Sequence, residues 1–129
     1  MQEQLTLPRN LEAEIALIGS ILIDEKLMVE ISDLIVPDDF YDQRNKLIYR
    51  TILNLFKENK SIDVTTVASV LISQNLIDQV GGVEYISSIG DRTYYSENYE
   101  TYCQLISEAA IKRNAINRLN KLAQDGYKV

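Results

Sequence analysis

The chemistry open to this chain is limited first by the residues it lacks. None of its 129 residues is histidine, the commonest general base and zinc ligand. None of its five glycines precedes a Lys-Ser or Lys-Thr pair, so the sequence holds no phosphate-binding P-loop. The adjacent acidic pairs Asp38-Asp39 and Asp24-Glu25 could be imagined as metal ligands or acid–base pairs, but both fall at expected helix junctions, where such residues cap turns. We therefore predict no catalytic, cofactor-binding or metal-binding residue.

Composition places the chain among ordinary single-domain globular proteins. Hydrophobic residues make up 46% of it and charged residues 25%, and its length suffices for a substantial core. The N-terminus is polar and acidic, unlike a signal peptide, and no apolar run approaches the roughly 20 residues of a membrane span. The single Cys103 excludes an internal disulfide and lies on an apolar helix face, so we expect it to be buried. A cytoplasmic protein is expected.

The longest element must be a helix over residues 96–123. This stretch contains no Gly or Pro and closes before Gly126, a residue type that commonly ends helices. Its apolar positions change sides along its length when placed at about 100° per residue. The early face consists of Tyr99, Tyr102, Cys103, Ile106, Ala109 and Ala110. The late face, roughly opposite, holds Ile111, Ala115, Ile116, Leu119, Leu122 and Ala123, while Arg113, Asn117, Asn120 and Gln124 continue the early side.

A helix with two apolar stripes in succession should pack on two bodies. We expect the first half to dock on the rest of the domain and the second half to project as an arm that awaits another helix. The predicted self-association residues are Ile111, Ala115, Ile116, Leu119 and Leu122.

The rest of the chain predicts an all-α fold with a compact helical head. Residues 1–10 form a polar leader and residues 11–95 the head, with helices expected at about 11–23, 25–34, 43–58, 65–76 and 83–89. Asn10 is the expected cap of the first helix, which is apolar nearly all round and should be central. Phe40 and Tyr41 are expected to plug the core. A helix-turn-helix over 66–74 and 83–89 is disfavoured, since the second helix offers Glu84 and no positive charge to a base edge.

Charge is divided unevenly along the chain. The net charge is -6, yet from Ala109 onward five basic residues face one acidic residue, and the remainder holds eight basic and eighteen acidic residues. A body this acidic repels phosphate backbones. The five basic residues are Lys112, Arg113, Arg118, Lys121 and Lys128. They form either a solvated helix face or a binding patch, and the second reading keeps a free-standing helical nucleic-acid-binding protein as the alternative function.

Short motifs in order along nearly the whole chain resemble the N-terminal domain of DnaB-type bacterial and phage replicative helicases. They are Leu7-Pro8, Leu11-Glu12-Ala13-Glu14, Gly19-Ser20-Ile21-Leu22-Ile23-Asp24, Val36-Pro37-Asp38-Asp39-Phe40-Tyr41, Ile48-Tyr49, Ile62-Asp63-Val64-Thr65, Val80-Gly81-Gly82-Val83-Glu84-Tyr85 and Ala123-Gln124-Asp125-Gly126-Tyr127. Each motif is weak alone, and the ordered set is specific.

The resemblance implies a head followed by a helical hairpin, with residues 96–129 as the first hairpin arm. Hairpins of neighbouring subunits pair, and three such dimers form a collar above a hexameric motor ring. The implied role is a non-catalytic scaffold in DNA replication. The implied partners are other subunits, the C-terminal domain of primase, a helicase loader, and single-stranded DNA through the full ring.

The resemblance also implies that ATP and magnesium act only in a separate motor domain of the parent protein. Because the chain stops at Val129, just past the turn at residues 125–127, we expect an excised N-terminal fragment without the second hairpin arm, linker and motor. The family's primase contacts match Tyr85, Ile116 and Leu122 here, and plain core packing is an equal explanation for each of these residues.

Overall fold

The computed structural model describes residues 6–92 and 98–127. In that part of the chain every regular element is a helix, which confirms the all-α prediction. The elements in order are α1 (Leu11–Ile23), η1 (Glu25–Leu27), α2 (Met28–Leu34), η2 (Pro37–Asp39), α3 (Gln43–Lys57), α4 (Val64–Ser73), α5 (Gly82–Asp91) and α6 (Tyr99–Gly126), where η marks a short 3-10 helix. Among the described residues, no helix is both long enough and apolar enough to cross a membrane.

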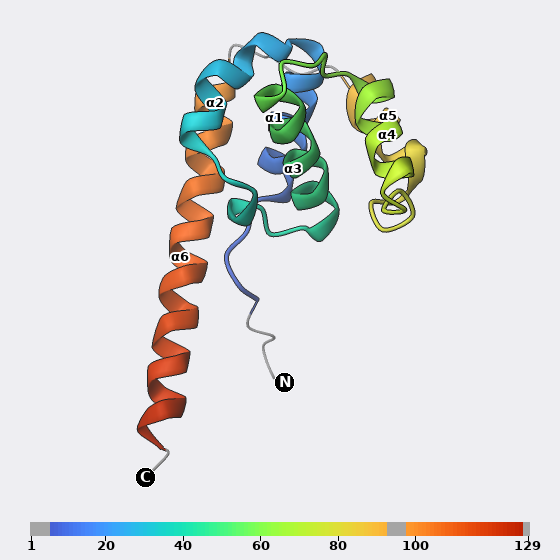
Figure 1. The fold of residues 1–129 in the computed structure, drawn as a ribbon. Coiled ribbons are helices and arrows are strands. Elements are labelled where there is room, and N and C mark those ends of the chain that lie inside the picture. Colours follow the sequence, from blue (N-terminus) through green and yellow to red (C-terminus); the bar gives the residue numbers. More distant parts are fainter. Residues whose placement is uncertain (1–5, 93–97, 128–129) are drawn as a thin grey trace.

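Helix α1 is the centre of the head, as its apolar sequence predicts. Asn10 caps it, because the side-chain oxygen of Asn10 accepts a hydrogen bond from the Ala13 N–H. Leu17, Ile18 and Ile21 are fully buried. Helices α3, α5 and α6 all pack against α1, so one apolar helix organises the core (Figure 1).

Three of the other head helices, α3, α4 and α5, begin after an acidic residue or a glycine. The Asp42 carboxylate accepts hydrogen bonds from two backbone N–H groups at the start of α3. Helix α4 begins at Val64 rather than at the expected residues 65–66, because Asp63 accepts from the Thr66 N–H and so closes the first turn earlier. Gly81, with a φ of 90°, precedes α5. Phe40 is buried as expected, and Tyr41 is half-buried.

Helix α6 is 28 residues long and leaves the head partway along its length (Figure 1). It ends three residues later than predicted, because Gly126 itself belongs to the last turn of the helix. The predicted start at residue 96 lies outside the described residues. Cys103, Ile106, Ala109 and Ala110 are buried against the head. Every residue from 114 to 127 is exposed, which confirms a docked first half and a projecting second half.

Candidate interaction site

The projecting half of α6 carries an exposed apolar stripe. Exposure reaches 67% at Ile111, 65% at Leu119 and 68% at Leu122, and Ala115 is also exposed. At about 100° per residue these four side chains follow one side of the helix, and Ile116, at 37% exposure, lies at its edge. We call these five residues the arm stripe. The structure therefore brings the predicted self-association residues together on one free surface.

One of the basic residues expected on the exposed surface of the arm, Arg113, is buried. Lys112, Arg118 and Lys121 are exposed, but Arg113 is only 7% exposed. The interpretation of Arg113 as an outward basic residue is wrong. Arg113 follows the buried Ala110 by three residues and the buried Ile106 by seven, so it lies on the same face of α6, the face that packs on the head. Its guanidinium donates to the main-chain carbonyls of Pro8 (3.0 Å) and Asp39 (2.7 Å).

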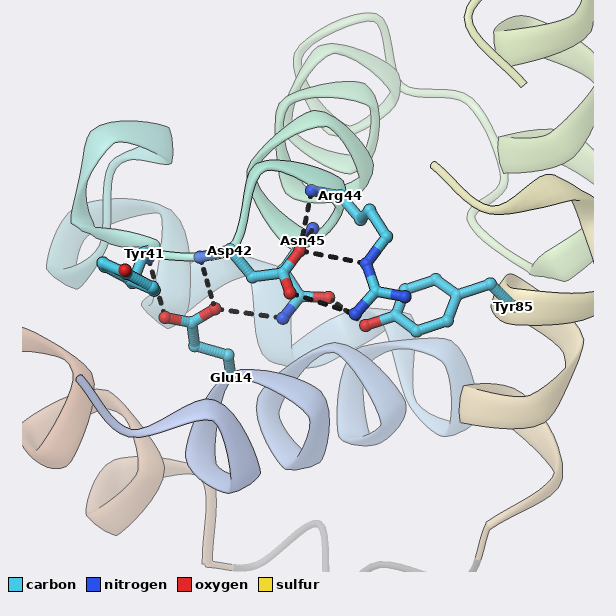
Figure 2. Close-up of polar contacts among 6 residues, drawn as sticks. All are labelled: Glu14, Tyr41, Asp42, Arg44, Asn45 and Tyr85. Carbon is cyan, nitrogen blue, oxygen red and sulfur yellow. Dashed lines mark hydrogen bonds and ion pairs between the residues drawn. The ribbon is translucent and has the colours of Figure 1, made fainter. Parts of the chain in front are cut away.

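Tyr85, a predicted primase contact, is tied into the head by a chain of polar side chains (Figure 2). Its hydroxyl donates to the Asn45 side-chain oxygen at 2.6 Å, and the Asn45 amide donates to Glu14 at 3.0 Å. The Arg44 guanidinium lies over the Tyr85 ring, 4.1 Å from its centroid. Three elements, α5, α3 and α1, meet at this chain of contacts, so Tyr85 has a structural role whatever it binds.

Glu14 is the buried end of this chain of polar contacts. It is 1% exposed, and its carboxylate also accepts from the N–H groups of Tyr41 (2.7 Å) and Asp42 (3.3 Å). Burial raises the pKa of Glu14 above its usual value, although these three hydrogen bonds oppose the shift. By sequence alone Glu14 is an acidic residue in the first turn of a helix, where its charge suits the positive N-terminal end. Its spacing of four and seven residues from Ile18 and Ile21 was the available sign that it faces the core.

A second carboxylate ties down Arg44. Asp42 forms a two-pronged ion pair with the Arg44 guanidinium, with its closest N–O distance at 3.1 Å. Burial works against the charged form of Asp42, but its hydrogen bonds with Arg44 lower its pKa below the usual value. Burial raises the pKa of the Tyr85 phenol, and the nearby Arg44 charge opposes that shift. The ring and guanidinium thus form a neutral–cationic stack on the head surface.

One member of each acidic pair, Asp39 and Asp24, serves as a cap, as predicted. Asp39 accepts from the Val36 N–H at 2.9 Å, and Asp24 accepts from the Lys26 N–H at 3.2 Å. Glu25 accepts from the distant Ile62 N–H at 2.7 Å. Within residues 6–92 and 98–127 no group of three or more Cys, Asp or Glu side chains is placed to hold a metal ion.

The fold is thus a helical head from which one long helix projects with an exposed apolar stripe. Residues 6–108 match the family model described as DnaB-like helicase N-terminal domain. The replicative DNA helicase DnaC of Bacillus subtilis is 34% identical over 120 residues, which cover 93% of this chain and 26% of that protein.

Solved structures agree with the sequence relatives. The N-terminal domain of DnaB helicase from Mycobacterium tuberculosis superposes with a TM-score of 0.91 at 25% identity, covering 95% of this chain and 88% of that one. A DnaB-like replicative helicase, described with its interactions with primase, gives a TM-score of 0.78 at 28% identity, covering 90% of this chain and 27% of that one. The chain therefore belongs to the DnaB-like helicase N-terminal domain family. It spans about a quarter of the length of the curated relatives it matches.

Proposed function

We propose that this chain is a non-catalytic scaffold domain of a replicative DNA helicase, and that it pairs with other copies through its arm stripe. In the assembled protein, pairs of domains form a collar of three dimers above a hexameric ring. The observation that carries the proposal is the free side of α6, where Ile111, Leu119 and Leu122 are each about two-thirds exposed.

The strength of this pairing follows from the apolar surface available. Burying a whole Leu or Ile side chain contributes roughly 1.5–3 kcal/mol, so the three most exposed residues supply about 3–6 kcal/mol per copy. Association costs on the order of 4–15 kcal/mol in lost freedom of motion. Two arms together supply about 6–12 kcal/mol, which exceeds only the lower part of that range of costs. A surplus of about 4–5 kcal/mol corresponds to a Kd of roughly 0.1–1 mM, so this chain alone should pair weakly. A second hairpin helix would add apolar surface and strengthen the pairing.

Sedimentation equilibrium over rising concentration tests the pairing. The chain should show a weak monomer–dimer equilibrium that disappears in the double variant Leu119→Gln, Leu122→Gln. Val29→Gln is the matched control, because Val29 is 64% exposed on α2 of the head, away from the arm. Purely monomeric behaviour of the unchanged chain up to about 1 mM would remove the pairing proposal.

We further propose that the C-terminal domain of primase docks on this module, using Tyr85 on the head and Ile116 and Leu122 on the arm. Support comes from the resemblance and from a structural relative, 28% identical, that is described with its interactions with primase. Calorimetric titration with that primase domain should show weaker binding to Leu122→Gln than to Val29→Gln. Equal affinities for the unchanged chain and for variants at all three positions would contradict the docking site.

Other roles of the whole protein stay with the parent helicase. We propose that a separate motor domain uses ATP and magnesium, that the ring holds single-stranded DNA, and that a loader acts on the assembled collar. The module itself would contribute assembly and partner docking. Helicase relatives that are about four times as long as the matched region support this division of labour.

A further inference from the structure

Arg113 is the last residue of α6 that the head covers, and it joins three separate segments. Its guanidinium donates to Pro8 in the leader and to Asp39 at the end of η2. The same group lies 5.5 Å from the centroid of the Tyr41 ring. Its planar fork of N–H donors suits two carbonyls at once, a geometry that a lysine does not reproduce.

The Tyr41 ring is itself fixed from several directions. The Arg9 guanidinium lies 4.8 Å from the ring centroid and also donates to the Tyr41 hydroxyl at 2.8 Å. The Tyr41 N–H donates to the buried Glu14 carboxylate of α1. Pro8 and Arg9 are neighbours, so the leader contacts both Arg113 and Tyr41. We call Arg9, Tyr41 and Arg113 the junction clamp.

The junction clamp lies at the point where α6 leaves the head and becomes exposed. Before it, the residues of α6 that are buried against the head, Cys103, Ile106, Ala109 and Ala110, have apolar side chains, and the last two are small. Beyond Arg113 about 13 residues extend without cover, which corresponds to roughly 20 Å of helix. A tilt of about 20° at the junction would move Gln124 by about 5 Å. A small angular freedom there therefore becomes a large displacement of the arm stripe.

We propose that the junction clamp is a positioning device that sets the angle at which the projecting arm leaves the head. The apolar contacts hold α6 on the head, and the directional hydrogen bonds of Arg113 fix its final turn. The consequence for pairing rests on the proposed function, since a fixed angle presents the arm stripe to a second copy in one orientation. The angle itself does not depend on pairing.

Pulsed electron spin resonance measures this angle directly in the full chain. Spin labels at Asn54→Cys on α3 and Gln124→Cys on the arm, in a Cys103→Ala background, report one head-to-arm distance. Both labelled positions are exposed. Arg113→Met keeps the apolar stem but removes the donors, and should shift or broaden the distance distribution by about 5 Å. Arg118→Met is the matched control on the free arm and should leave it unchanged.

Two milder variants test the junction clamp in case Arg113→Met unfolds the head. Tyr41→Leu keeps the N–H that Glu14 accepts but removes the ring and hydroxyl, and Arg113→Lys keeps the charge but not the fork. Both should give intermediate distributions in a folded head. A wild-type distribution in all three variants, or unfolding of the head in place of a changed angle, would overturn the clamp. A changed angle in a chain that never pairs would uphold the clamp and remove only the pairing proposal.

Discussion

Glu14 offers the sharpest test of how the head is held together. Three donors converge on its carboxylate, with one oxygen accepting from Tyr41 and the other from Asp42 and Asn45. Glu14→Gln keeps the size of the side chain but replaces one acceptor oxygen by an NH2 donor. If the remaining oxygen keeps its two donors, the new NH2 group meets the Tyr41 N–H at a site where the carboxylate oxygen now lies 2.7 Å away.

The expected cost follows from that mismatch. A buried donor left without an acceptor costs about 1–3 kcal/mol, and the amide avoids the cost of burying a charge. We expect a net loss of about 2 kcal/mol in the free energy of unfolding at neutral pH. For a chain of this length that corresponds to a drop in Tm of about 7 °C. Thermal unfolding followed by circular dichroism measures it.

The pH dependence of the difference tests the electrostatic part. Burial raises the folded-state pKa of Glu14, so the folded state binds its proton more tightly than the unfolded state does. The contribution of Glu14 to stability is therefore full below its unfolded pKa and falls as the pH rises through the folded pKa. Glutamine does not titrate, so the penalty of Glu14→Gln should be largest in acid and smaller at neutral pH.

Glu12→Gln provides the matched control, since Glu12 lies in the same first turn of α1 but is exposed. It should change stability by less than about 0.5 kcal/mol at neutral pH. A penalty for Glu14→Gln that grows as the pH rises would refute the reasoning, because it would mean that the three donors depress the pKa more than burial raises it. A penalty no larger than that of Glu12→Gln would refute the role of Glu14 as an anchor.

Two further tests, one of them with a control on the arm, probe packing and buried hydrogen bonding in the head. Gly90→Ala places a Cβ 2.8 Å from a Val64 methyl carbon, so we expect a lower Tm despite the better helix propensity of alanine. Gly126→Ala is the control, because a Cβ there has nothing within 4 Å, and it should leave the Tm unchanged or raise it slightly. A lower Tm for Gly126→Ala than for Gly90→Ala would contradict this account. Tyr49→Phe removes the hydroxyl that donates to the buried Ile35 carbonyl at 2.8 Å, and chemical denaturation should show a loss of about 1–2 kcal/mol, whereas an unchanged midpoint would show that the carbonyl finds another donor.

The sequence by itself determined the elements of this protein. Asn10 signals the start of α1 because its side chain satisfies a local backbone donor, and the apolar spacing of α6 predicts which of its faces is buried against the head. The change of apolar face within α6 predicts the arm, and the ordered short motifs indicate the family. These signals are local, since capping and helical periodicity join residues three to seven positions apart.

Tertiary structure alone decided how the elements are joined. Arg113 looks like one more cation on a basic helix until its carbonyl partners, 105 and 74 residues away in the chain, are known. Glu14 likewise looks like a helix-end charge until donors 27 to 31 residues further along converge on it. Whether a charged side chain is solvated or buried depends on which distant backbone groups reach it. Local sequence carries no record of those distances, so the anchor of the head and the clamp of the arm emerged only from the folded chain.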